Sequence, residues 1–181
     1  MKLKSLIVVL LCIVVCSSCE QPPIEAYAVL PQPQEINYVQ GFVKLKDKPM
    51  VVYSNELSNE ALLLASYLKN DFAVEVTLEE GKDKGDVILL LDSTVLPDKK
   101  GGYVLEAAGS RITIKASTPE GVFNGVQTLR QIIKEREGRL TVQKALVTDY
   151  PAFSWRAFML DEGRYFKGKE VVLNLLDRMA E

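Results

Sequence analysis

Two acidic residues and an arginine lie close together near the C-terminal end of the sequence, within the run WRAFMLDEGRYF at 155–166. Asp161 and Glu162 are adjacent carboxylates, residue types that serve as general acid and general base. Because neighbouring side chains of a β-strand point to opposite faces, these two cannot act on one bond while the strand continues through them. Arg164 offers several donors in a planar fork, and Asp161 is spaced to hold it. The run therefore predicts a binding arginine with a supporting aspartate, or else an ordinary surface ion pair.

The composition excludes several classes of site. The 181 residues include no histidine, so the chain can form neither a histidine-ligated zinc site nor a Ser-His triad. Its 22 basic and 24 acidic residues give a net charge of −2, without the clustered basic face of a nucleic-acid interface. We therefore expect no nucleic-acid partner. The three cysteines, Cys12, Cys16 and Cys19, all precede residue 20.

The N-terminus has the pattern of an export signal. Two lysines precede an apolar run at 6–15, which is too short to span a bilayer, and two serines stand directly before Cys19. We predict removal of residues 1–18, a lipid anchor on Cys19, and a place in the bacterial cell envelope, facing the periplasm or on the cell surface. The alternative is an ordinary signal that leaves Cys19 as a free thiol. An extended, proline-rich tether is expected over 19–26.

Loss of residues 1–18 would change the charge and the cysteine content. It removes two lysines and no acidic residue, so the mature chain has 20 basic and 24 acidic residues and a net charge of −4. One cysteine remains, which excludes an internal disulfide. The mature domain must therefore be stabilised by its core alone.

Periodicity predicts the elements that precede the acidic run. Apolar residues spaced three or four apart predict a helix over 57–72. Thr118 and Pro119 predict the start of a second helix, which we expect to run to Glu137 and to end at Gly138. β-strand composition marks the runs 50–53, 73–78, 87–91, 103–106, 111–115 and 140–147.

This pattern predicts an α+β fold over 27–150, a mainly antiparallel sheet with two helices on one face. The runs 103–106 and 111–115 flank a Gly-Ser turn and are expected to form a hairpin. After Pro151 the sequence predicts one strand and one amphipathic helix, at 170–180. A single strand–helix unit cannot close a core of its own, so it is either an appendage or the start of a larger domain.

Two motifs resemble family 20 of the glycoside hydrolases, the β-N-acetylhexosaminidases. Residues 125–129, Gly-Val-Gln-Thr-Leu, are similar to the family's Gly-x-Gln-Thr-Leu, and residues 155–164 are similar to its Trp-Arg-Gly-x-x-Leu-Asp-x-x-Arg. Tyr165 stands in the position of a family histidine. The resemblance implies that 151–181 begins a (β/α)8 catalytic barrel and that the chain holds the first βα unit of that truncated barrel.

Other residues of the two motifs are predicted to be structural. Gln127 and Thr128 are expected on the polar side of the second helix or at a domain junction. Phe153 and Trp155, which precede the expected barrel strand, are expected in packing between domains.

The resemblance also implies a function. Family members remove terminal N-acetylglucosamine or N-acetylgalactosamine from glycans, with the substrate's own 2-acetamido group as nucleophile. They need no metal and no organic cofactor. The arginine of the second motif binds the terminal sugar, which assigns substrate binding to Arg164, supported by Asp161.

The family's catalytic Asp-Glu pair follows a His-x-Gly-Gly motif, which residues 1–181 lack. We therefore expect no catalytic residue in this chain, no activity of the chain alone, and dependence on the remainder of the barrel. The alternative is a non-catalytic envelope lipoprotein that binds glycan or protein.

Overall fold

The computed structural model describes residues 23–81, 83–153 and 155–180. The predicted signal segment and Cys19 lie outside these residues. Within them, no helix has the length and apolar character needed to cross a membrane. The elements follow in the order β1 (Glu35–Lys44), β2 (Met50–Tyr53), a 3-10 turn (Asn55–Leu57), α2 (Ser58–Phe72), β3 (Thr77–Glu80), β4 (Val87–Leu91), β5 (Tyr103–Ala108), β6 (Arg111–Ala116), α3 (Pro119–Ile132), β7 (Lys134–Arg136), β8 (Arg139–Asp149) and α4 (Lys169–Ala180).

The strands form one mixed sheet in the order β1-β8-β5-β6-β4-β2-β3, with β7 paired to β8. The pairs among β1, β8, β5 and β6 are antiparallel, and those among β6, β4, β2 and β3 are parallel. The expected α+β class is confirmed, but the expectation of a mainly antiparallel sheet holds for one half only. The parallel half arises because α2 carries the chain from the end of β2 back to the start of β3, as a crossover must.

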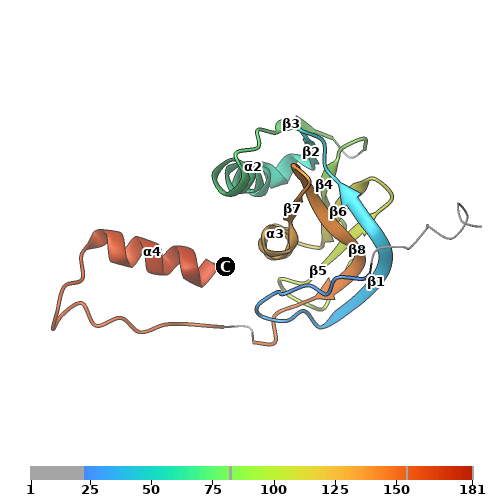
Figure 1. The fold of residues 1–181 in the computed structure, drawn as a ribbon. Helices are drawn as coiled ribbons and strands as arrows, with labels where there is room; N and C mark the ends of the chain where they lie inside the picture. Colours follow the sequence, from blue (N-terminus) through green and yellow to red (C-terminus); the bar gives the residue numbers. More distant parts are fainter. Residues whose placement is uncertain (1–22, 82, 154, 181) are drawn as a thin grey trace, which may run out of the picture.

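Helices α2 and α3 cover the same face of the sheet, as predicted (Figure 1). Helix α3 packs over β4, β5 and β6, whereas α2 packs over β2 and β3 and also contacts α3. Their inward side chains meet those of the sheet in one core, which removes apolar surface from water and provides most of the stability. Its largest buried side chains include Tyr103, Leu57, Leu64, Leu68, Leu89, Leu105, Ile112, Ile114 and Leu129.

Helix α3 begins as predicted but ends earlier. The Thr118 hydroxyl accepts a hydrogen bond from the Gly121 amide at 3.3 Å and caps the helix. The helix stops at Ile132, and the following residues form β7, which pairs with β8. Glu137 and Gly138 have φ values of 52° and 73° and form the turn of the β7–β8 hairpin. The predicted end at Glu137 was therefore wrong, because pairing with β8 takes the chain out of the helix.

Two other strands differ from expectation. β1 was not predicted, although it pairs with β8 along much of its length. The strand expected over 73–78 begins only at Thr77, because Ala73 has a left-handed φ of 56°. The amides of Ala73 and Val74 donate to the Lys69 and Leu68 carbonyls, which closes the end of α2 before the strand can start.

The segment after Pro151 contains the predicted helix, α4, but its described residues form no strand. Figure 1 shows residues 155–168 as an extended run that leads to α4, outside the sheet. No residue of α4 is buried. A strand needs a neighbour for its backbone hydrogen bonds, and no described strand pairs with this run. The expected first barrel strand is therefore not formed in this structure.

Candidate functional site

Asp161 organises a tight turn that holds Arg164. Its Oδ1 accepts hydrogen bonds from the amides of Gly163, at 3.0 Å, and Arg164, at 3.1 Å. Its Oδ2 lies 3.3 Å from the Arg164 Nε, while the Arg164 side chain is 93% exposed. The pairing predicted from the spacing is present. An exposed pair of this kind adds little stability, so the arginine can exchange its partner for a ligand at low cost.

Glu162 does not join Asp161 in a catalytic pair. Its Oε2 accepts a hydrogen bond from the Lys167 amide at 2.8 Å, and its Oε1 is buried without a partner among the described residues. Each of the two carboxylates therefore binds different amides of the same turn. Tyr165, in the position of the family histidine, is exposed, and the Lys167 ammonium lies 4.4 Å from its ring centre.

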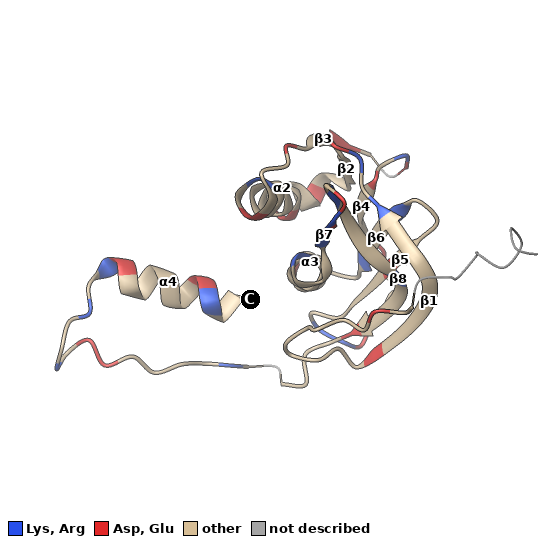
Figure 2. Ribbon diagram, viewed as in Figure 1, with Lys and Arg blue, Asp and Glu red and all other residues tan. Residues whose placement is uncertain are grey.

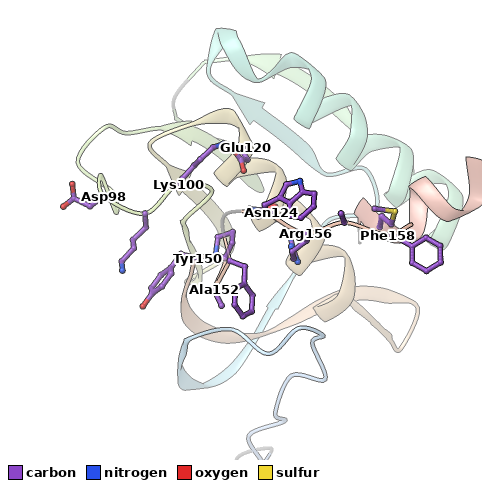
Figure 3. Close-up of a pocket in the computed structure, with 14 residues that line it drawn as sticks. Asp98, Lys100, Glu120, Asn124, Tyr150, Ala152, Arg156 and Phe158 are labelled. Atoms are coloured by element: carbon purple, nitrogen blue, oxygen red, sulfur yellow. Dashed lines mark ion pairs between the residues drawn. The ribbon is translucent and has the colours of Figure 1, made fainter. Parts of the chain in front are cut away.

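A cleft of about 700 Å³ lies between the α+β domain and the segment that follows it. Figure 3 shows residues of its lining: Glu120 and Asn124 on α3, Arg156 beside that helix, and Phe158, whose ring points away from it. On the domain side the Lys99 ammonium lies 4.3 Å from the centre of the Tyr150 ring. The cleft thus combines aromatic surface with charged and amide side chains.

Many large apolar side chains of the C-terminal segment face solvent. They are Phe153, Trp155, Phe158, Met159, Tyr165, Phe166, Val171, Leu173, Leu176 and Met179. A patch of this extent is typical of a surface that another part of a protein covers. Phe153 and Trp155 also line the cleft, a position compatible with the packing role predicted for them.

A polar network, buried at Tyr103 and Thr128, joins the end of β8 to α3. The Tyr103 hydroxyl lies 2.5 Å from the Thr128 hydroxyl and donates to Asp149 Oδ2 at 3.2 Å. Asp149 Oδ1 accepts a hydrogen bond from the Gln34 amide at 3.1 Å. Burial raises the pKa of the Tyr103 phenol, so it stays protonated and able to donate. This network fixes the point at which the chain leaves the domain.

Gln127 and Thr128 are buried rather than on a polar side of α3, which corrects that alternative, and they line a second cleft with Tyr150 and Phe153, as expected for residues at a domain junction. The Gln127 amide donates to the Tyr67 hydroxyl at 3.1 Å and thereby links α3 to α2. Both side chains are buried. Sequence reasoning missed this role because their partners, Tyr67 and Tyr103, are distant in the sequence. The neighbouring sequence therefore carried no signal for this burial.

No group of three or more His, Cys, Asp and Glu side chains that could bind a metal ion occurs within 23–81, 83–153 and 155–180. The described part of the chain thus offers an exposed arginine held by an aspartate, aromatic-lined clefts beside α3 and an uncovered apolar segment.

The family model for glycosyl hydrolase family 20, domain 2, matches residues 26–150. The chain belongs to glycosyl hydrolase family 20. The matched residues coincide with the α+β domain and end at Tyr150, where the cleft and the uncovered segment begin.

Two β-hexosaminidases resemble the chain and support this assignment. The chain is 31% identical over 161 residues to a β-hexosaminidase of Porphyromonas gingivalis, covering 84% of this chain and 21% of that protein. It is 27% identical over 172 residues to β-hexosaminidase subunit A2 of Dictyostelium discoideum, covering 91% of this chain and 31% of the relative. The chain thus spans about a fifth to a third of the length of these family 20 relatives.

Solved structures share the fold. The family 20 exo-β-N-acetylglucosaminidase of Vibrio harveyi matches with a TM-score of 0.73 and 23% identity, over 89% of this chain and 26% of the other. The β-N-acetylhexosaminidase of Bacteroides fragilis matches with a TM-score of 0.70 and 25% identity, over 83% and 30%. Because residues 1–150 make up less than 89% of the chain, the likeness to the Vibrio harveyi structure extends past Tyr150.

Proposed function

We propose that this chain is the N-terminal part of a β-N-acetylhexosaminidase that hydrolyses terminal N-acetylglucosamine or N-acetylgalactosamine residues of glycans by substrate-assisted retaining catalysis. The observation that carries the proposal is the 31% identity over 161 residues to the β-hexosaminidase of Porphyromonas gingivalis. Residues 27–150 form the domain that supports the catalytic barrel, and residues 151–181 supply the first βα unit of that barrel.

Arg164 is the residue that we propose to contact the terminal sugar. Its guanidinium is exposed, and its backbone is fixed by the Asp161 carboxylate, which also holds Nε. The remaining guanidinium N–H groups have the fixed planar spacing that suits vicinal hydroxyl oxygens. Asp161 acts as a positioning residue, because it reaches the sugar only through Arg164.

We further propose that residues 1–181 have no activity alone. The sequence contains no His-x-Gly-Gly motif, and its one adjacent Asp-Glu pair near Arg164 is engaged with backbone amides. The general acid and the residue that orients the acetamide group would come from the remainder of the barrel. The uncovered apolar side chains of 153–179 are the surface that the barrel would bury.

A chimaera tests both parts of the proposal. Residues 27–180 of this chain replace the aligned segment of the Porphyromonas gingivalis enzyme, and release of nitrophenol from 4-nitrophenyl N-acetyl-β-glucosaminide is measured. We expect an active chimaera, and Arg164→Ala should lower its kcat/KM by roughly 10- to 100-fold, the value of one or two hydrogen bonds from a charged group. Arg111→Ala, which removes an exposed arginine of the β5–β6 hairpin, is the matched control and should leave kcat/KM unchanged.

The outcomes separate the claims. A folded but inactive chimaera contradicts the proposed function, whereas an active chimaera that tolerates Arg164→Ala contradicts only the site. Nitrophenol release by purified residues 20–181 contradicts the absence of activity in the chain alone. If the chimaera does not fold, the transcript gives a second test. In-frame codons for His-x-Gly-Gly and an adjacent Asp-Glu pair downstream of codon 181 support the enzyme, and their absence refutes it.

Export and lipidation are proposed from the sequence alone. The basic start, the apolar run at 6–15 and the serines before Cys19 support processing as a bacterial lipoprotein. Metabolic labelling with palmitate should mark the chain in a bacterial host, and Cys19→Ser should abolish the label. A labelled Cys19→Ser variant, or an unlabelled native chain in the membrane fraction, contradicts lipidation of Cys19.

A further inference from the structure

The second cleft beside α3 has the size and the polarity of a ligand site. We call it the junction cleft: it lies between the residues before β1, one side of α3 and the residues that follow β8, and its volume is about 270 Å³. That volume is close to the lower end of the range of small-molecule sites, about 300–1,000 Å³. Arg164 does not line it. The junction cleft is therefore separate from the turn that holds Arg164.

Three amide side chains of α3 form a row along this cleft. Asn124, Gln127 and Gln131 follow one another at spacings of three and four residues within the helix, which brings them to one side of it. All three line the cleft. A primary amide has two N–H donors and a carbonyl oxygen that accepts. The row therefore offers both kinds of hydrogen-bonding group to a ligand.

Hydrogen bonds within the domain hold the two outer amides of the row in place. Asn124 Nδ2 donates to a backbone carbonyl of the β4–β5 loop at 2.8 Å. The Gln131 side chain exchanges two hydrogen bonds, of 3.0 and 3.1 Å, with the Leu30 amide and carbonyl. A primary amide can form about four hydrogen bonds, so both side chains keep capacity for a ligand. Because these amides are already ordered, binding a polar ligand costs little side-chain entropy.

The central amide of the row has an acceptor that the described residues leave unsatisfied. Gln127 is 4% exposed, and its Nε2 donates to the Tyr67 hydroxyl, whereas its Oε1 is buried without a partner. A buried acceptor without a hydrogen bond costs free energy, which a donor supplied by a ligand, directly or through a bridging water, recovers. The row is therefore incomplete without a further donor.

A carboxylate and an aromatic ring complete the lining. Asp149 accepts one hydrogen bond at each oxygen, from the Gln34 amide and the Tyr103 hydroxyl. Each carboxylate oxygen has a second lone pair, so Asp149 can also accept from a hydroxyl group of a ligand. Phe153 lines the same cleft and is 73% exposed. Its ring offers an apolar face against which the C–H groups of a ligand can pack.

The charge of the lining favours an uncharged ligand. Residues 26–34, the tan segment that leads into β1 in Figure 2, contain no charged side chain. Of the lining residues, only Asp149 and Arg156 are charged, and their charges are opposite. A neutral molecule with hydroxyl and amide groups on its edges and an apolar C–H face matches this surface. An N-acetylated sugar has all of these features.

We propose that the junction cleft is a second glycan-binding site, which takes a neutral N-acetylated sugar. The amide row contacts the hydroxyl and acetamide groups of the sugar, and Phe153 packs against its ring. An apolar surface laid over the cleft would leave Asp149 and the amides without partners, so a polar occupant suits this junction better. Clefts between domains are also preferred positions for ligand sites. The inference goes beyond the proposed hydrolase function, because it requires neither Arg164 nor the remainder of a barrel.

Calorimetric titration with N,N′-diacetylchitobiose tests the proposal. The full chain is expressed in a bacterial host, purified and titrated with this sugar and with cellobiose, which has no acetamide group. We expect saturable binding of the N-acetylated sugar, at least about fivefold tighter than that of cellobiose, because the acetamides add groups that the row can bind. Phe153→Ala should weaken binding roughly three- to tenfold through loss of the aromatic contact. Phe166→Ala is the matched control, because Phe166 is 71% exposed and does not line the cleft.

Asn124→Ala, which shortens the amide row, should weaken binding about fivefold, and circular dichroism checks that each variant is folded. If Asn124→Ala does not fold, Phe153→Ala decides, since an exposed ring can be removed without disturbing the core. No saturable binding, equal binding of cellobiose, or an unchanged affinity of Phe153→Ala overturns the proposal. Binding that Arg164→Ala abolishes and Phe153→Ala retains assigns the sugar to the Arg164 turn and also overturns it. None of these results refutes the hydrolase function, which the chimaera tests separately.

Discussion

Gly125 is one of the positions at which α3 approaches the sheet too closely for a side chain. A Cβ at this position would lie 2.5 Å from the Ile114 Cγ2 of β6 and 3.1 Å from the ring of Tyr103. Neither neighbour can yield easily. Ile114 is β-branched and buried, and the Tyr103 ring is fixed by the hydrogen bonds that its hydroxyl forms with Thr128 and Asp149. Gly125→Ala therefore requires α3 to move away from the sheet.

The expected cost is the balance of two effects. Overpacking a well-packed core by one methyl group costs about 1–3 kcal/mol. Alanine is more favourable than glycine inside a helix by about 1 kcal/mol, which offsets part of that cost. Because the contact of 2.5 Å places the overpacking at the upper end of its range, we expect Gly125→Ala to lower the free energy of unfolding by about 2 kcal/mol, the difference between about 3 and about 1 kcal/mol. Without the contact, the same substitution would stabilise the protein.

Urea unfolding of residues 20–181, followed by circular dichroism, measures this change. Asn70→Ala, on the exposed side of α2, is the control for an alanine introduced into a helix and should change the stability little. Ile114→Ala removes the clashing atom. Its combination with Gly125→Ala should cost less than the sum of the single changes, with a coupling of about 0.5–3 kcal/mol. A Gly125→Ala variant at least as stable as the native chain, or strict additivity, would refute the reasoning.

Three further predictions concern stability. Thr118→Ala removes the cap of α3 and should cost about 1 kcal/mol in urea unfolding, whereas Thr118→Ser should retain the cap; equal losses contradict the capping role. Burial raises the pKa of Tyr103, so the folded state keeps this proton after the unfolded state has lost it, and stability falls above about pH 10. Tyr103→Phe should make that decline shallower by up to about 1.4 kcal/mol per pH unit. An unchanged slope would contradict the assignment of the decline to the raised pKa of Tyr103. Glu25→Gln removes ion pairs with Lys134 and Arg136 and should cost about 0.5 kcal/mol at low salt and less at high salt, and a cost that persists at high salt contradicts an ionic contribution.

The sequence predicts elements whose signals are local. Thr118 and Pro119 mark the start of α3 because capping depends on neighbouring residues alone. The end of α3 depends on pairing with β8, so Gly138 was mistaken for a helix stop when it forms a hairpin turn. In β1 a register shift between Tyr38 and Phe42 interrupts the alternation of apolar side chains that reveals a strand. The parallel half of the sheet escaped prediction because pairing partners are not encoded locally.

The same distinction between local and distant partners decides which features of the candidate site the sequence predicts. The spacing of Asp161 and Arg164 predicts their pairing, since three residues bring the two side chains together in a tight turn. The burial of Gln127 could not be predicted, because its partner Tyr67 belongs to another helix. The strand expected after Pro151 did not form among the described residues, because a strand depends on partners outside itself.

The geometry of Asp161 explains why the turn can exist without that strand. Its carboxylate binds two backbone amides and one guanidinium within four residues, so every interaction is local and needs no neighbouring chain. The apolar residues Phe158 and Met159 just before it have no such local partners and stay exposed. The side-chain geometry of Arg164 can therefore be set without the proposed barrel, whereas burial of the apolar residues requires a further surface to cover them. If this order holds, Asp161→Asn in the chimaera should weaken sugar binding more than it weakens folding.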